Sequence, residues 1–154
     1  MFTTYNILKA IHVLAAVTWV GGAISFNILG TRLKNGANPR TLGDVAREFE
    51  FIGTRVFLPT SLILFGLGIW MVIISGWNFT DLWILIGLAG IVATIITGSA
   101  VIGPRSKRLG ETLEVKSPED PDVQRQIGEL IAYSRIDLVV LIIVVLDMVI
   151  KPGV

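Results

Sequence analysis

Apolar residues fall into four long runs that are separated by polar connections. The runs cover about residues 5–30, 56–75, 82–103 and 131–150. A helix that crosses the hydrocarbon layer needs roughly 20 apolar residues, and each run is long enough. The pattern therefore predicts an all-α fold, a four-transmembrane-helix bundle that forms a single membrane domain over residues 1–154.

Composition supports a membrane environment and excludes several kinds of site. Hydrophobic residues make up 53% of the 154 residues, charged residues only 16%, and the mean hydropathy is +0.73. Such a chain is expected to contact the lipid bilayer. Because cysteine is absent, disulfides and thiolate metal sites are excluded. The net charge of +1, without a long basic run, predicts no nucleic-acid partner.

The placement of the cations predicts an orientation. Arginine and lysine concentrate in the connections between the first and second runs and between the third and fourth, whereas residues 76–81 contain none. By the positive-inside rule, the two basic connections are cytoplasmic. Both termini then lie on the outer side of a bacterial cytoplasmic (inner) membrane.

The basic connections also show signals of helical extensions. Thr41, with Asp44 three residues later, predicts the start of a helix that runs into the second span. Asp120 precedes Pro121 and predicts that the fourth helix begins near this point and projects into the cytoplasm. Within the second span, Pro59 predicts a kink because it lacks a backbone donor.

Small residues recur within the first and third runs. Gly21 and Gly22 lie in the first, and Gly87 and Gly90 lie in the third. In membranes such residues let helices approach closely. We expect them to serve helix packing.

The only histidine, His12, lies inside the first apolar run. Helical periodicity places Lys9, His12 and Trp19 on one face. Counting about 1.5 Å per residue from the outer ends puts further groups at a similar depth. This predicted outer layer also contains Met71, Asp147, Met148 and Lys151.

Charged residues within the spans are expected to be paired, because an unpaired charge at membrane depth is costly. Asp147 and Lys151 have the i, i+4 spacing of an ion pair. Nearer the cytoplasm, Arg135 and Asp137 enter the fourth span and Arg55 enters the second. We expect Asp137 to pair with Arg55 in a structural role.

The outer layer has the chemistry of a haem site. An imidazole is a common iron ligand, and a methionine thioether can supply the second axial position. Lys9 and Lys151 would meet the haem propionates, and Trp19 would supply an aromatic wall. Met71 and Met148 are the candidate thioethers. Other interpretations remain open: a histidine that only joins helices, a proton site, a metal site at His12, or a copper(I) site formed by His12 and the methionines. No phosphate loop or other catalytic constellation is visible, so no catalytic residue is assigned.

Two motifs resemble known families. Lys9-x-x-His12 followed by Trp19-x-Gly21-Gly22 resembles the first helix of small bacterial membrane proteins, which include HemJ-type protoporphyrinogen oxidases and CopD-type copper-resistance membrane domains. The ending Val149-Ile-Lys151-Pro152-Gly153 is similar to the lysine-proline ending of the HemJ type. In length and layout the chain most resembles a related family of predicted integral membrane proteins with no assigned function.

The HemJ-type resemblance implies a haem b site and a redox role. In that type the first-helix histidine is associated with haem b, and the protein oxidises protoporphyrinogen IX. It implies that His12 is the haem ligand and that Lys9 and Lys151 meet porphyrin carboxylates. The alternatives are CopD-like copper handling, or a structural or accessory subunit without cofactor or enzymatic activity. A homo-oligomer or a larger membrane complex is expected.

Overall fold

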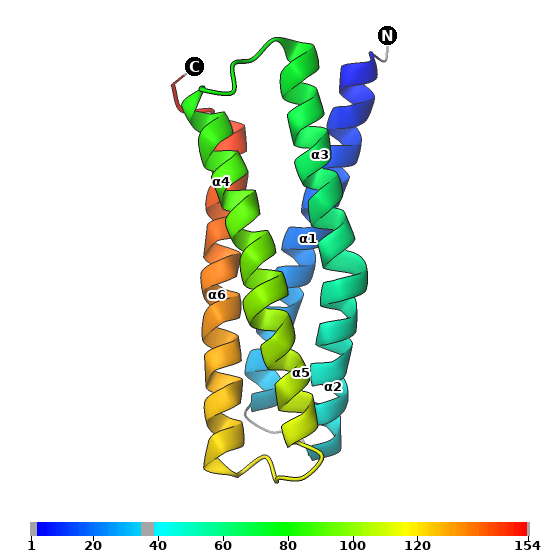
Figure 1. Ribbon diagram of the computed structural model, residues 1–154, viewed down its shortest axis with the longest axis vertical. Coiled ribbons are helices and arrows are strands. Elements are labelled where there is room, and N and C mark those ends of the chain that lie inside the picture. The colour runs from blue at the N-terminus through cyan, green and yellow to red at the C-terminus, as the bar shows by residue number, and fades with distance from the viewer. Residues whose placement is uncertain (1–2, 35–38, 154) are drawn as a thin grey trace.

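A computed structural model describes residues 3–34 and 39–153, and its long helices run side by side in an elongated bundle (Figure 1). No strand occurs within these two ranges, so the all-α prediction is confirmed. Two of the long helical segments contain a π-helical turn, η1 and η2. The elements are α1 (Thr4–Lys34), α2 (Pro39–Ile52), η1 (Gly53–Phe57), α3 (Leu58–Ser75), α4 (Leu82–Ile96), η2 (Thr97–Ile102), α5 (Gly103–Thr112) and α6 (Pro121–Ile150).

Among the described residues, three helical segments are long and apolar enough to cross a membrane: Thr4–Arg32, Gly43–Ser75 and Leu82–Thr112. They contain the first three predicted spans, and the last two are longer than predicted because α2 and α5 continue them without a break. The fourth predicted span, in α6, is not among the three. Its apolar half carries Arg135, Asp137 and Asp147. A fourth crossing therefore remains a prediction.

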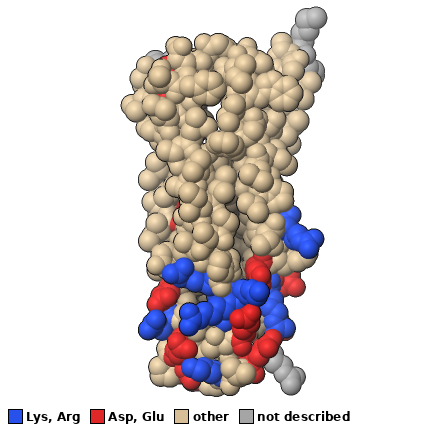
Figure 2. Space-filling model, viewed as in Figure 1, with Lys and Arg blue, Asp and Glu red and all other residues tan. Residues whose placement is uncertain are grey.

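Charge divides the bundle into two unlike ends. The described ends of α1 and α6 nearest the termini lie at one end, and α2 and α5 lie at the other (Figure 1). Lys, Arg, Asp and Glu gather over the end that holds α2 and α5, whereas the rest of the visible face is almost free of them (Figure 2). The predicted extensions are thus helical and highly charged.

The start of α6 agrees with the prediction near Asp120. The Oδ1 atom of Asp120 accepts a hydrogen bond of 2.8 Å from the backbone N–H of Asp122 and caps the helix. A hydrogen bond from the Lys116 ammonium holds the pKa of the Asp122 carboxyl below its ordinary value. The start of α2 differs from the prediction, because α2 begins at Pro39 and Thr41 lies inside it. Proline favours the first helical turn, where its missing N–H costs nothing.

A π-helical turn precedes a proline in two segments. Turn η1 ends at Phe57, two residues before Pro59, and η2 ends at Ile102, two residues before Pro104. Proline lacks an N–H and clashes with the preceding helical turn, and a wider turn relieves that clash. The distortion expected at Pro59 thus takes the form of a π-turn. Pro104 provides a second instance that the sequence analysis missed.

Glycines hold neighbouring helices close at three of the predicted positions. A Cβ atom at Gly22 would overlap the Phe57 ring, one at Gly87 would overlap Met148, and one at Gly90 would overlap Val144. These contacts confirm the packing role of the three glycines. The expectation was wrong for Gly21, which has no neighbouring atom within 4 Å of the Cβ position and faces outward.

Buried apolar side chains form clusters along the length of the bundle. The middle cluster contains Trp19 of α1, Leu64 of α3 and Leu141 of α6. A second lies at the charged end and a third near the α3–α4 connection. Their members are Ala46, Leu109, Val123, Ile127 and Leu130 in the second, and Val72, Trp83 and Ile84 in the third.

Candidate functional site

A cavity of about 380 Å³ lies between the helical segments, on the side of the middle cluster nearer the charged end. Small-molecule sites have volumes of roughly 300–1,000 Å³, so the cavity is large enough to bind one. We call it the central pocket. The lining residues on which the argument depends are Trp19, Phe26, Asn27, Phe49, Glu50, Phe57, Thr94, Ser106, Ser134 and Asp137.

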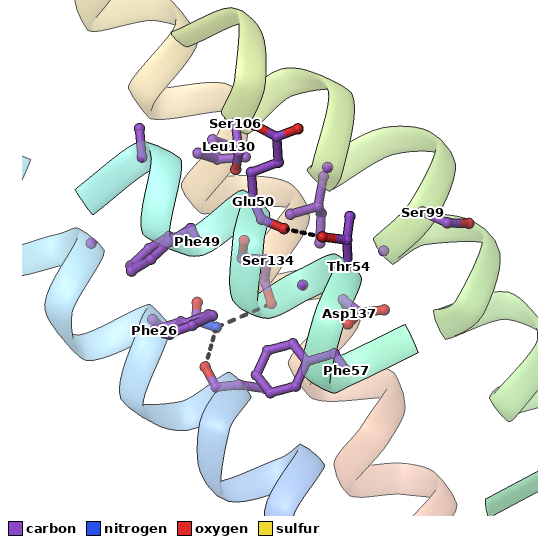
Figure 3. A pocket seen from close by; sticks show the side chains of 18 of the residues that line it. Phe26, Phe49, Glu50, Thr54, Phe57, Ser99, Ser106, Leu130, Ser134 and Asp137 are labelled. Atoms are coloured by element: carbon purple, nitrogen blue, oxygen red, sulfur yellow. Dashed lines mark hydrogen bonds between the residues drawn. The ribbon is translucent and has the colours of Figure 1, made fainter. Parts of the chain in front are cut away.

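Aromatic rings form one wall of the central pocket (Figure 3). The Phe26 ring of α1 stacks on the Phe49 ring of α2, with ring centroids 4.1 Å apart and an interplanar angle of 17°. Phe57, at the end of η1, packs against Phe26 at a centroid distance of 5.3 Å. Gly22 makes room for the Phe57 ring, since any side chain there would overlap it. The wall therefore depends on contacts between α1 and the α2–η1 segment.

Both π-turns contribute to the lining. Thr54 and Phe57 come from η1, and Gly98 and Ser99 come from η2. The hydroxyl of Thr54 donates to the Glu50 carbonyl at 2.9 Å, so it satisfies its own helix. The hydroxyl of Ser99 does the same toward Ile95 at 2.7 Å. π-Turns inside α-helices frequently occur at functional sites, and here two of them border one cavity.

Three polar side chains of the lining contain a buried atom without a hydrogen-bond partner among the described residues. They are the Oδ1 atoms of Asp137 and Asn27 and the Oγ atom of Ser106. The Asn27 amide nitrogen, in contrast, donates to the carbonyls of Ala23 at 2.9 Å and Ser134 at 3.3 Å. Asn27 thereby joins α1 to α6 while its oxygen remains unpaired. Buried polar groups are normally paired, so these three atoms are available to a ligand or to water inside the pocket.

The surroundings of Asp137 differ from the prediction. Asp137 is only 9% exposed, and the described lining residues include two carboxylates, Glu50 and Asp137, but no lysine or arginine. The expected Arg55–Asp137 pair was wrong, because the Arg55 guanidinium lies over the Phe51 ring, 5.9 Å from its centroid. Arg135 also points elsewhere and donates to the Thr31 hydroxyl at 3.3 Å.

The predicted outer layer is distributed over different helix contacts. His12 faces α3, since its Cε1 atom lies 3.5 Å from where a Cβ at Gly68 would be. Its Nδ1 atom is buried and has no hydrogen-bond partner among the described residues, but the imidazole also interacts with the Leu64 backbone of α3. Met148 instead packs on Gly87 of α4. Of the other predicted members, Met71 is half-buried on α3, and Lys9 is exposed on α1.

The expected Asp147–Lys151 ion pair was also wrong. The Lys151 ammonium lies over the Trp83 and Trp77 rings, 4.8 Å and 5.0 Å from their centroids. Both Asp147 carboxylate oxygens are buried and have no partner among residues 3–34 and 39–153. The reason is local, because Lys151 ends α6 in the left-handed conformation with φ 49°. This turn takes its side chain away from the i, i+4 position assumed for a continuing helix.

Residues 6–152 match the family model described as predicted integral membrane protein (DUF2269). The chain belongs to this family. No curated protein and no solved structure matches it. Membership of DUF2269 confirms the expected membrane-protein family, while a relationship to the HemJ-type and CopD-type proteins remains a prediction.

Most residues of the central pocket in this DUF2269 chain were not predicted from the sequence. Trp19, assigned to a wall beside His12, borders the pocket and packs in the middle cluster. Asn27 and Ser134 carried a usable signal, since polar side chains inside apolar runs seek partners. Nothing in the sequence indicated that Phe49 lines a pocket, because Phe49 lies in an extension that was expected to face the cytoplasm. Within the described residues, no group of three or more His, Cys, Asp or Glu side chains could hold a metal ion.

Proposed function

We propose that this DUF2269 member is a membrane-embedded binding protein whose ligand occupies the central pocket. The observation that carries the proposal is the set of unpaired acceptor atoms, on Asn27 and Asp137, in a cavity with aromatic walls. Binding sites for small molecules combine a largely apolar lining with a few polar groups that fix orientation. The ligand therefore has an apolar body and a group that acceptor atoms can hold, which is either a hydrogen-bond donor or a positive charge.

Photochemical crosslinking with 4-hydroxybenzophenone tests this proposal, because the probe combines an apolar aromatic body with one donor. We expect peptide mapping to find crosslinks on pocket residues from both α1 and the α2–η1 segment. Ser134→Phe places a ring in the pocket and should lower this yield about tenfold. Ser25→Phe, a matched change on the exposed face of α1, should leave it unchanged. Crosslinks confined to lipid-facing residues, with equal yields in both variants, would contradict the proposal.

We also propose that α6 is a fourth span and that both termini lie outside the inner membrane. Of the three charges in its apolar half, Asp137 and Asp147 are buried inside the bundle rather than exposed to lipid. The third, Arg135, is exposed and donates a hydrogen bond to the Thr31 hydroxyl of α1. The concentration of cations over α2 and α5 supports the orientation.

Cysteine labelling tests this topology without background, since the chain has no cysteine. In intact cells, a membrane-impermeant maleimide should label Asn78→Cys and Gly153→Cys but not Lys116→Cys. All three positions are exposed in the structure. Equal labelling at 116 and 153 in cells where 78 is labelled would show that α6 does not cross the membrane.

A haem b or porphyrin at His12 is the second candidate function. The buried, unpaired Nδ1 atom of His12 favours it, whereas the interaction of the same ring with the Leu64 backbone favours a histidine that joins α1 to α3. A bound haem would supply one-electron redox chemistry, as the HemJ-type resemblance implies. The residues fit it only in part. His12 offers an imidazole and Lys9 a free ammonium, but Lys151 lies on two tryptophans and Met148 is packed against α4.

An absorption spectrum with metal analysis of the purified protein separates these ligands. A Soret band that is lost in His12→Ala and retained in Asp137→Asn would assign haem to His12. Stoichiometric copper would instead favour CopD-like copper handling. Colourless, metal-free protein from haem-replete and copper-replete cells would overturn both.

A further inference from the structure

We propose that the ligand of the central pocket is an organic cation and that Asp137 is its counter-ion. This inference rests on the proposed function, and it adds the charge of the ligand. The cation is an ammonium or a larger lipophilic cation with an apolar body that fills the cavity.

The first argument is the unbalanced charge of the lining. Asp137 is 91% buried, because its exposed fraction is 9%, and its Oδ1 atom has no partner among the described residues. The two cations predicted near it, Arg55 and Arg135, contact Phe51 and Thr31 instead. Glu50 adds a second carboxylate to the lining, and no described lining residue is basic. A buried carboxylate normally has a cationic partner, and none of the described residues supplies one to Asp137.

The second argument is the aromatic wall. Phe26, Phe49 and Phe57 come together from three elements at the cavity surface, and Figure 3 shows Phe57 on the same side of the pocket as Asp137. The faces of aromatic rings carry negative potential and attract cations, most strongly where water is excluded. The carboxylate and the rings thus favour the same sign of ligand charge.

The same features disfavour an anionic ligand. Carboxylates of a porphyrin or a fatty acid require nearby lysine or arginine, and two carboxylates in the lining would repel them. An organic cation can come from two sources in a membrane: the ammonium headgroup of a phospholipid or a free lipophilic cation. Both have the chemistry that the central pocket fits.

Equilibrium binding of tetraphenylphosphonium to the full chain in phosphatidylglycerol nanodiscs tests the inference, with empty nanodiscs subtracted. Tetraphenylborate has nearly the same shape and the opposite charge. We expect saturable binding of the cation and at least about tenfold weaker binding of the anion. Asp137→Asn, which preserves side-chain shape, should weaken cation binding about tenfold and leave the weak anion binding unchanged or slightly tighter.

Asp147→Asn is the matched control, because Asp147 is also a buried, unpaired carboxylate of α6 but lies outside the central pocket. It should bind the cation as the wild type does. Equal loss in both variants, or equal affinity for the two ions, would overturn the inference. If 4-hydroxybenzophenone still labels the pocket in that case, only the charge of the ligand is wrong and the proposed function stands.

A second nanodisc composition distinguishes the two sources. If phosphatidylethanolamine replaces phosphatidylglycerol and weakens tetraphenylphosphonium binding in the wild type but not in Asp137→Asn, a lipid ammonium occupies the pocket. If wild-type affinity is unchanged, the ligand is a free cation. Gel filtration of the purified Asp137→Asn variant would detect misfolding. If this variant misfolds, Ser134→Phe is the second test, and we expect it to lose binding of tetraphenylphosphonium.

Discussion

Gly90→Leu is expected to lower the free energy of unfolding by about 3 kcal/mol, the upper end of the usual cost of overpacking. A Cβ atom at this position would already overlap Val144 of α6. Valine is branched at Cβ and has little rotamer freedom in a helix, so it cannot move aside. The two helices must separate instead, and contacts along α4 and α6 are lost.

Unfolding of the purified protein in mixed micelles with increasing dodecyl sulfate measures this effect. Gly66→Leu is the matched control, because Gly66 lies in α3, is exposed and has no atom within 4 Å of its Cβ position. It should change stability little. A similar loss in both variants would show that α4 and α6 are not in the close contact described.

Trp19→Ala is expected to destabilise the protein by about 3 kcal/mol through the cavity that it creates. Trp19 is 6% exposed and packs with Leu64 and Leu141 in the middle cluster. Lipid tails are as apolar as the side chain, so the loss comes mainly from packing rather than from exposure to water. The change should also enlarge the central pocket, which Trp19 borders.

Trp70→Ala is the control for Trp19→Ala, because Trp70 is 53% exposed. The same unfolding measurement should show a change below about 1 kcal/mol for this variant. If Trp70→Ala were as costly as Trp19→Ala, burial in the middle cluster would not explain the cost of removing Trp19.

Some helix ends and helix contacts were predictable from the sequence. Asp120 caps the start of α6 by accepting a hydrogen bond from the Asp122 N–H, and Pro121 lies between them. Such local signals can be recognised from the sequence alone. Gly22, Gly87 and Gly90 were correctly expected to lie at helix contacts. Membership of DUF2269 agrees with the membrane-protein assignment.

The direction in which each side chain points around its helix was not predictable. Residue counting placed Asp137 near Arg55 in depth but did not show that Arg55 would lie on Phe51. It likewise placed Lys151 beside Asp147, whereas a left-handed residue at the helix end moves the ammonium onto Trp77 and Trp83. Depth depends on the number of residues, but pairing depends on helix rotation and on how helix ends are capped.

The central pocket could not be predicted because it forms from long-range packing. Its walls require two π-turns to face each other and Phe26 to stack on Phe49 across two helices. The prolines at 59 and 104 indicate where the backbone is distorted, but not that both distortions border one cavity. The sequence pattern therefore favoured His12 as the binding residue, whereas the pocket contains Asp137.

An experimental structure of the protein in lipid nanodiscs, determined by cryo-electron microscopy with and without tetraphenylphosphonium, tests the central claim most directly. The account predicts added density between the Phe26–Phe49 wall and Asp137 when the cation is present, with Arg55 remaining on Phe51. A closed cavity in which Asp137 pairs with Arg55, or ligand density at His12 and none at Asp137, would contradict it.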